Sequence, residues 1–441
     1  MPSMASDLSE HIQATPLCDT HEHLDKERIW VEEGPADVLC DLFRNYVPAD
    51  LISAGASPEA VQALSRPEAG DLESRLSGVE PAWRAIRHTG YGEAVRLLAE
   101  EIYGMPPDWG AADLEGAQAK LADWRRPGGR RRLLEETGGI DHTQTDDGCW
   151  PCLPDASGPG FFFYDITWAA FCNGDVRPAD LAEETGLTVG DLSSLRLAMA
   201  AIFTRYAPCA IAVKAQHAYS RTLHWRERTD AEAAAALQAV LSRGHGNVPE
   251  ETRLTLGDWC WARGVELAIE HDLPFKLHTG YYAGNDRMPV SRIHGGNLCA
   301  LLARYLDCRF VLMHIAYPYG DELVALAKHY RNVYADLCWA WSIDPFSSVD
   351  FVRRFLHAAP ANKLFAFGGD TRWPTSASAY AIQARRWLTR ALRAEVEDGL
   401  MSEAEAIAAA SRLMRDNQYD CFRVEARRES VAAAAGGTEG G

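Results

Sequence analysis

The sequence lacks a long apolar run, a basic excess and the common motifs of nucleotide-binding or serine-dependent enzymes. No stretch of about 18 or more apolar residues occurs, so no transmembrane helix is expected. The N-terminal stretch carries Asp7, Glu10 and His11 in place of an apolar signal-peptide core, which favours a cytoplasmic protein. Gly-x-Ser-x-Gly, P-loop and Gly-x-Gly-x-x-Gly patterns are also missing, which removes the usual signatures of those enzyme classes.

Positive charge is scarce. Lysine and arginine number 44 against 62 aspartates and glutamates, for a formal net charge of −18. This balance opposes binding to nucleic acid or to an anionic membrane and favours a small-molecule substrate. The one basic cluster, five arginines within residues 125–132, fits a solvated helix start or a site for an acidic partner. Helical outer faces would also be compatible with a homo-oligomer.

Eleven cysteines are scattered through the chain, an odd number in a large sequence. Such usage fits reduced thiols better than a disulfide scaffold. Cys149-Trp150-Pro151-Cys152 has the spacing of a redox pair or half a zinc site, but no second Cys-x-x-Cys accompanies it. Because proline and glycine crowd this stretch, we predict a loop.

Short β-like runs alternate with helical stretches along the chain, which predicts an α/β fold with a parallel sheet. Eight repeats favour a closed (β/α)8 TIM barrel. The predicted strands are Pro16–Thr20, Ile140–Thr145, Phe161–Ile166, Cys209–Lys214, Leu273–His278, Arg309–His314, Asn332–Leu337 and Lys363–Gly369. The helices predicted between and before them include Gly92–Tyr103, Gly257–His271, Gly296–Leu306 and Glu322–Tyr330.

One long segment interrupts this rhythm after the first strand. Residues 31–136 are predicted to form a helical insertion, which in a barrel would lie at the active-site end. Ser402 and Glu405 form a capping-box pattern for a last helix that reaches about Phe422. The barrel domain is therefore expected to span residues 1–430, followed by a disordered tail at 431–441.

The stretch Cys18-Asp19-Thr20-His21-Glu22-His23-Leu24 contains the first candidate site. Side chains two residues apart on a strand share a face, so His21 and His23 point the same way. Two neutral imidazoles so placed can bind one divalent metal ion.

Later strands also end in residues that can bind a metal or move a proton: Lys214, His278, His314 and Asp370. In a parallel barrel all carboxyl ends of the strands meet at one face. Residues far apart in sequence would therefore surround one point. Each histidine alone is equally compatible with a satisfied core position, but the placement of all of them at strand ends indicates a shared site.

This pattern resembles the amidohydrolase superfamily of metal-dependent hydrolases. More specifically, the second half resembles the branch with the uronate isomerases and the amidohydrolase domain fused to glutamine-synthetase-like proteins. The stretches that carry the likeness are VKAQHAY (213–219), HTGY (278–281), LMHIAYP (312–318), NVYAD (332–336) and FGGD (367–370).

The resemblance implies roles for the strand-end residues. His21 and His23 would bind the metal, and Asp370 would contact it and act as general base. His278 would be a further ligand or would contact a second metal, and the same holds for His314, which could instead donate a hydrogen bond to a developing oxyanion. The metal would be zinc, or else manganese, as one ion or two.

The sequence leaves three roles open for Lys214. The resemblance offers a carboxylated lysine that bridges two metals, and the residue itself offers a cation for a substrate carboxylate or a lysine paired with an acid. The remaining candidates are for substrate binding. Arg221 and Arg372 could clamp a carboxylate, and Tyr281 and Trp339 could line the pocket.

The sequence therefore predicts a metal-dependent hydrolase for an amide or other C–N bond in a small polar or acidic molecule. Uronate-isomerase-like aldose–ketose isomerisation and metal-dependent non-oxidative decarboxylation use the same ligands and stay open. A metal-free binding barrel predicts apolar residues at the ligand positions, whereas this chain has histidines and an aspartate there.

Overall fold

The computed structural model describes residues 7–437 and contains an eight-stranded, all-parallel sheet in which the strands follow one another in chain order. Every predicted strand is present, and the last four are shorter than predicted. The strands are β1 (Leu17–Glu22), β2 (Ile140–Thr145), β3 (Phe162–Thr167), β4 (Ala210–Ala215), β5 (Phe275–Leu277), β6 (Phe310–Leu312), β7 (Val333–Asp336) and β8 (Leu364–Phe365).

The sheet closes through backbone hydrogen bonds between β1 and the segment that follows β8. The Thr20 N–H donates to the Phe367 carbonyl at 3.1 Å. The Asp370 N–H donates to the His21 carbonyl at 2.9 Å, and the His23 N–H donates to a carbonyl of the same segment. The predicted TIM barrel is therefore confirmed, and its seam runs through the residues predicted to hold the metal.

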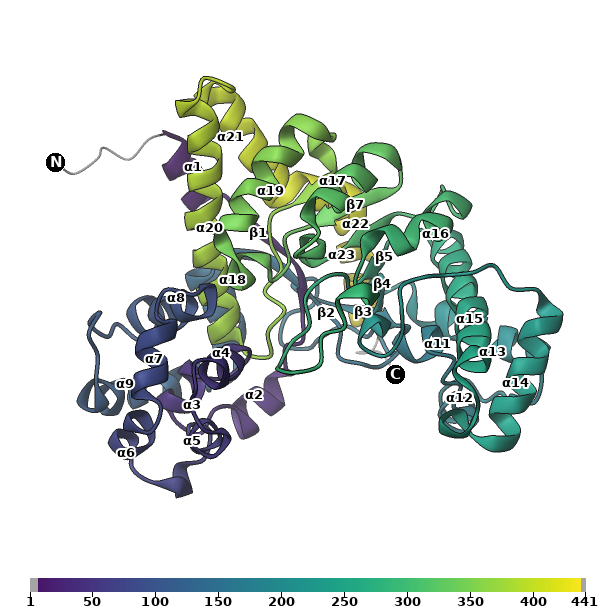
Figure 1. Cartoon of the computed structure of the whole chain (residues 1–441), viewed down its shortest axis with the longest axis horizontal. Helices are drawn as coiled ribbons and strands as arrows, with labels where there is room; N and C mark the ends of the chain where they lie inside the picture. The colour runs from purple at the N-terminus through teal and green to yellow at the C-terminus, as the bar shows by residue number, and fades with distance from the viewer. Residues whose placement is uncertain (1–6, 438–441) are drawn as a thin grey trace.

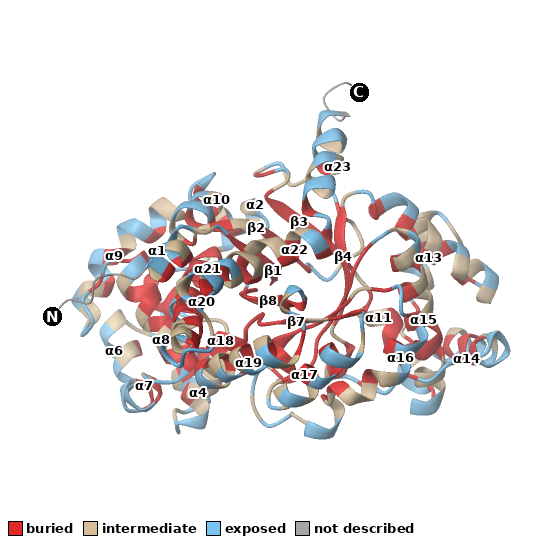
Figure 2. Cartoon of the chain, turned by 90° about the horizontal axis from the view of Figure 1, so that it is seen from above, coloured by how far each residue is buried: buried red, intermediate tan, exposed pale blue. Residues whose placement is uncertain are grey.

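Burial on both faces explains the composition of the strands. All six residues of β4 (AIAVKA) are buried, as a parallel strand covered by helices requires. Figure 2 shows the buried strands at the centre and the exposed helix faces outside. The covering helices are α11 (Ala169–Cys172), α12 (Pro178–Thr185), α13 (Leu192–Tyr206), α14 (Asp230–Arg243), α15 (Glu250–Glu270), α16 (Cys299–Arg304), α17 (Gly320–His329), α18 (Ala340–Ile343) and α19 (Pro345–Ala358).

The predicted helical insertion lies between β1 and β2, and its helices gather on one side of the barrel, purple to blue in Figure 1. There α8 packs against α20, so the insertion is anchored to the carboxyl-terminal part of the chain. Its elements are α2 (Glu27–Glu33), α3 (Val38–Leu42), α4 (Val47–Ser53), α5 (Pro58–Ala63), α6 (Leu72–Ser77), α7 (Glu80–Ile86), α8 (Gly90–Leu97), π-helix η2 (Leu98–Ile102), α9 (Ala111–Trp124), α10 (Gly129–Arg132) and π-helix η3 (Leu133–Thr137).

Helices from both ends of the chain complete the shell. They are α1 (Asp7–Ala14), α20 (Pro374–Glu397), α21 (Glu403–Ser411), π-helix η10 (Arg412–Asp416), α22 (Asn417–Phe422) and α23 (Val424–Gly437). Short 3₁₀ turns are η1 (Pro67–Ala69), η4 (His217–Tyr219), η5 (His245–Asn247), η6 (Val290–Arg292), η7 (Gly295–Leu298), η8 (His314–Ala316) and η9 (Ala361–Lys363). The capping box is confirmed, because the Ser402 hydroxyl accepts from the Glu405 N–H at 3.3 Å and the Glu405 carboxylate accepts from the Ser402 N–H at 2.8 Å.

The expected disordered tail is wrong for residues 431–437. These residues continue α23, which projects from the body of the molecule in Figure 2. Val424 and Val431 are buried and fix the first half of the helix, and the alanines that follow have high helix propensity. Residues 438–441 lie outside the described part of the chain.

The structure also answers the questions left by the cysteines and the arginine cluster. All eleven cysteines are free thiols, and burial raises the pKa of Cys149 to about 12, so its sulfur stays protonated. Within the arginine cluster, Arg130 is buried against Asp155 at 2.9 Å, and Arg125 donates to two backbone carbonyls of the insertion.

In the part of the chain that is described, no helix is long and apolar enough to cross a membrane.

Candidate functional site

Three ligand atoms from the two edges of the seam converge. His21 Nε2, His23 Nε2 and Asp370 Oδ1 form a triangle with all three sides 3.3 Å long. Ligand atoms about 2.0–2.1 Å from a tetrahedral zinc ion lie about 3.3–3.4 Å apart. The triangle therefore has the dimensions of one face of a metal site, and the donor set of two imidazoles and a carboxylate suits zinc.

Neighbouring groups set the imidazole tautomers for this role. The His23 Nδ1–H donates to the Asp146 carbonyl at 2.7 Å, which leaves the lone pair of Nε2 directed at the triangle. His21 Nδ1 faces Asp165 Oδ2 across 3.9 Å. Asp165 is itself held by the Lys276 ammonium, 2.9 Å from both carboxylate oxygens. The residues present thus fit a divalent ion both in the ligands and in the groups behind them.

The electrostatics of the cluster keep the ligands in metal-binding forms. Burial alone would raise the pKa of Asp370, but the adjacent His21 and His23 imidazoles hold it well below its usual range. Burial and the Lys214 ammonium lower the pKa of His21. At neutral pH the cluster therefore offers an ionised carboxylate and a neutral His21 imidazole.

Lys214 belongs to the same cluster. Its side chain is buried, and its Nζ lies 3.1 Å from His21 Nε2. Among the described residues no carboxylate forms an ion pair with Nζ, so the reading of a lysine paired with an acid is wrong. The two remaining readings, a carboxylated bridge and a cation for the substrate, stay predictions.

His278 and His314 form a second pair beside the triangle. His314 Nε2 is 2.9 Å from His278 Nδ1 and 3.9 Å from Asp370 Oδ2. The outer nitrogens of the pair face the carbonyls of Cys338 and Tyr281 at 3.0 Å each and must donate to them. Burial lowers the pKa of His314 to about 4, so two neutral rings turn lone pairs toward each other. Such an arrangement favours a bound cation or hydrogen-bond donor there.

The backbone is strained where three site residues follow their strands. His314, Trp339 and Asp370 have φ values of 63°, 61° and 56°, in the left-handed region that costs non-glycine residues energy. The Tyr46 hydroxyl, from the insertion, donates to the Asp370 carbonyl at 2.5 Å and so helps to fix this conformation. Gly369 precedes it, and a Cβ at that position would overlap Glu22 Oε1.

Aromatic rings cover the histidine pair. The Trp339 ring centre lies 5.4 Å from that of His314, 5.9 Å from that of Tyr281 and 4.2 Å from that of Tyr46. The structure therefore brings Trp339 and Tyr281 to the site, as the sequence predicted. Tyr46 was not predicted, because nothing in the sequence marks one aromatic residue of the insertion above the others.

A hollow of about 520 Å³ opens beside His23 and is also bordered by Asp146, Gln216 and Arg372. Arg372 is about half exposed, with an ion pair to Asp25 at 2.7 Å, so its guanidinium lies where a substrate would approach. This hollow is the approach to the triangle from solvent, since His23 is the most exposed of the three ligands.

Arg221 takes a different place from the one predicted. Its buried guanidinium donates to Asp258 at 2.5 Å and to the Cys172 carbonyl at 2.9 Å. Because Asp258 on α15 is buried too, the pair neutralises two charges inside the protein. The predicted clamp on a substrate carboxylate at the metal triangle is therefore wrong for Arg221.

Sequence reasoning also missed Asp165 and Lys276. Lys276 is fully buried in β5, where an ammonium group requires a partner. A lysine in the middle of the apolar stretch LPFKLH was the available signal, but its partner at the end of β3 is 111 residues away in the chain.

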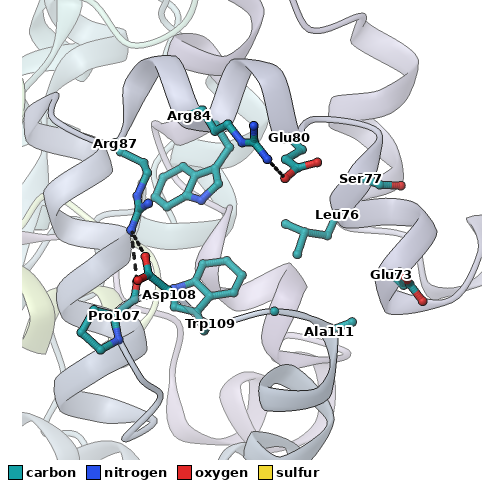
Figure 3. Close-up of a pocket in the computed structure, with 12 residues that line it drawn as sticks. Glu73, Leu76, Ser77, Glu80, Arg84, Arg87, Pro107, Asp108, Trp109 and Ala111 are labelled. Atoms are coloured by element: carbon teal, nitrogen blue, oxygen red, sulfur yellow. Dashed lines mark hydrogen bonds and ion pairs between the residues drawn. The ribbon is translucent and has the colours of Figure 1, made fainter.

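A separate hollow of about 480 Å³ lies entirely within the insertion (Figure 3). Its arginines are already paired, Arg84 with Glu80 at 2.5 Å and Arg87 with Asp108 at 3.4 Å. None of the triangle, Lys214 or the histidine pair borders it. This hollow is therefore separate from the candidate site at the barrel mouth.

Three comparisons agree with this geometry. Protein fluG of Emericella nidulans is 24% identical over 241 residues, which cover 52% of this chain and 27% of that protein. The chain thus spans about a quarter of the length of this relative.

Two solved structures share the fold over the whole chain. A uronate isomerase of Thermotoga maritima superimposes with a TM-score of 0.79 at 14% identity, covering 95% of this chain and 97% of that one. A glucuronate isomerase of Caulobacter crescentus gives 0.77 at 17% identity, covering 96% and 94%. The sequence profile of the family described as amidohydrolase matches residues 177–406, which include Lys214, His278, His314 and Asp370. The chain belongs to this amidohydrolase family.

Proposed function

We propose that the protein is a metal-dependent hydrolase that cleaves an amide or other C–N bond in a small polar or acidic molecule. The observation that supports this most is the equilateral triangle of His21 Nε2, His23 Nε2 and Asp370 Oδ1 beside a solvent-connected hollow. The triangle would hold the ion, zinc or else manganese. A divalent ion held there lowers the pKa of a nearby water molecule and polarises a carbonyl group.

Asp370 is the proton carrier in this proposal. Its Oδ1 is directed at the two imidazoles, whereas its Oδ2 lies on the side of His314. Oδ2 accepts a proton from the attacking water and delivers it to the departing nitrogen. The water oxygen bonds to the carbonyl carbon, the C–N bond breaks, and the products are a carboxylic acid and an amine, which become a carboxylate and an ammonium group when the acid proton passes to the amine. The low pKa of Asp370 keeps it ionised before each turnover.

The other site residues position the substrate. A substrate oxygen beside the lone pairs of His278 and His314 would meet no hydrogen-bond donor, whereas an N–H group or a cation would meet two acceptors. Trp339 and Tyr281 form the wall against which the substrate lies. Arg372 at the rim is placed to bind a carboxylate of an acidic substrate, and Lys214 is placed to bind one deeper in the site.

Two variants test this function. His21→Ala should lose the metal, measured by elemental analysis, and should lose activity on a panel of N-acyl amino acids and γ-glutamyl amides while keeping its circular dichroism. Asp370→Asn should keep much of the metal and lose turnover, because the amide cannot accept the proton. Full activity of His21→Ala, or unchanged turnover of Asp370→Asn, would contradict the proposal.

Isomerisation of a uronic acid is the second candidate. A set of three ligand atoms for one ion, with the Lys214 ammonium 3.1 Å from His21 Nε2, is compatible with this reaction. The two solved structures compared above, a uronate isomerase and a glucuronate isomerase, also support it. Conversion of glucuronate to its ketose by the metal-loaded protein, with no hydrolysis in the amide panel, would favour this candidate.

A further inference from the structure

The hollow beside His23 is the first of three that share lining residues. Gly148 borders both this near hollow and a middle hollow of about 320 Å³. Ala170, Asp175 and Arg177 border both the middle hollow and a distal hollow of about 420 Å³. The three hollows are therefore neighbours in series, and we call the series the track; it begins at His23, a candidate metal ligand.

The track lies on the face of the barrel where the strands end. Gly148 follows β2, Thr167 ends β3, and Ala170 lies in the helix directly after it. Ser220, which borders the distal hollow, follows β4. The chain thus uses consecutive loops of its active-site face to extend the approach to the triangle away from His23.

The middle hollow offers an aromatic surface. Trp150 and Phe171 border it, and their rings stack with centres 5.8 Å apart and an interplanar angle of 23°. Trp150 is only partly buried, so one face of the indole is available to a ligand. A planar apolar group lying on this ring would gain stacking and burial. The Cys149-Trp150-Pro151-Cys152 loop thereby has a role that its protonated thiols do not supply.

The distal hollow offers a cation. Arg253 borders it from the first turn of α15, and within residues 7–437 its guanidinium has no hydrogen-bond or ion-pair partner. Arg221, in the wall of the same hollow, is already neutralised by Asp258. Arg177 is paired with Asp175 at 2.8 Å. Arg253 is thus the group there with unused capacity for a carboxylate.

We propose that this track binds one elongated substrate, and this proposal rests on the hydrolytic function of the triangle. The reacting amide lies at the His23 end, a planar apolar group lies on Trp150, and a terminal carboxylate reaches Arg253. The substrate class is therefore an N-acyl compound with an aromatic or similarly flat spacer and an acidic end. A small amide without these parts occupies only the near hollow.

The test measures binding of three hydroxamates to the zinc-loaded protein by titration calorimetry, because a hydroxamate binds the metal whether or not catalysis occurs. The probes are acetohydroxamate, 4-phenylbutanohydroxamate, and the latter with a carboxyethyl group in the para position. Each extension should tighten binding by about tenfold, the gain from one aromatic contact or one charge-assisted pair.

Two variants assign each gain to its residue. Trp150→Ala should remove the gain from the phenyl group, and Arg253→Gln should remove only the gain from the carboxylate. Trp109→Ala, in the hollow of Figure 3, and Arg243→Gln, an exposed arginine on α14, are matched controls that should keep both gains.

The outcomes separate the two proposals. Equal affinity of the wild-type protein for all three probes, or gains that survive in both Trp150→Ala and Arg253→Gln, would overturn the track even if amides are hydrolysed. Graded affinity that these variants abolish, together with no hydrolysis of any amide in the panel, would support the track and overturn the hydrolytic function.

Discussion

Removal of the Lys276 ammonium by Lys276→Met should destabilise the protein strongly and in a pH-dependent way. In the native state Lys276 and Asp165 are both fully buried, and Nζ is 2.9 Å from each carboxylate oxygen and 2.7 Å from the Thr20 carbonyl. Methionine fills nearly the same volume, so the change removes charge and donors rather than packing.

The expected loss of stability follows from the buried carboxylate that the substitution leaves without a cation. Asp165 would keep a buried carboxylate whose nearest cationic candidate, His21 Nδ1, is 3.9 Å away, too far for a hydrogen bond. Breaking one side of a buried ion pair costs about 3–5 kcal/mol because the other charge is left uncompensated. We therefore expect the free energy of unfolding at pH 8 to fall by about that amount.

The pH dependence identifies the cause. In the wild-type protein burial raises the pKa of Asp165, but Lys276 and His21 together outweigh burial and lower this pKa below its usual value. The stabilisation by Asp165 is therefore present above the unfolded pKa of about 3.9 and constant between pH 8 and pH 5. Without the cation, burial raises the native pKa above the unfolded one, so the variant gains stability as the pH falls. The deficit should shrink from pH 8 to pH 5.

Urea unfolding of the metal-free protein, followed by tryptophan fluorescence at both pH values, measures the difference in unfolding free energy between the variant and the wild-type protein. Lys363→Met is the matched control, because Lys363 is also buried but donates to the carbonyls of Ala327 and Tyr330 and pairs with no carboxylate of the described residues. Its deficit should not depend on pH. A deficit for Lys276→Met below about 1 kcal/mol, or one equal at pH 8 and pH 5, would refute the reasoning.

Two further predictions concern the seam. Gly369→Ala should displace Glu22 or the backbone of residues 369–371. Stability in urea unfolding should fall by about 1–3 kcal/mol, and elemental analysis should show loss of zinc. Unchanged stability and unchanged zinc content would contradict the close approach of Gly369 to Glu22. Tyr46→Phe removes the donor to the Asp370 carbonyl, which should cost about 1 kcal/mol of stability and lower kcat more than it raises KM in steady-state assays. An unchanged kcat would remove Tyr46 as a positioning residue.

The barrel and the convergence of its strand-end residues were predictable because two rules sufficed. Buried parallel strands are apolar runs, and their carboxyl ends share a face. His21, His23, Lys214 and Asp370 each stand at such an end, and the structure places their polar atoms within about one hydrogen-bond length of His21 Nε2.

Arg221 shows where these rules stop. It follows β4, the position expected of an arginine that binds a substrate carboxylate, yet its partner Asp258 lies on a helix 37 residues later. Only the packing of α15 against the loop after β4 decides that this guanidinium faces inward. The same holds for Asp165 and Lys276, whose pairing depends on the barrel register.

The prediction of a disordered tail was wrong for another reason. Its small residues suggested disorder by composition, whereas a run of alanines also favours helix once a preceding helix supplies the first turn. Val431 then packs back onto the protein and fixes the outcome for residues 431–437.

The seam has a consequence for how the enzyme is made. Its candidate metal ligands come from the first strand and from residue 370, so a nascent chain would hold only two histidines of the site until most of the polypeptide has left the ribosome. Binding of the ion would be among the last events of biosynthesis. The bound ion would then link the first strand of the barrel to the segment that follows the last strand.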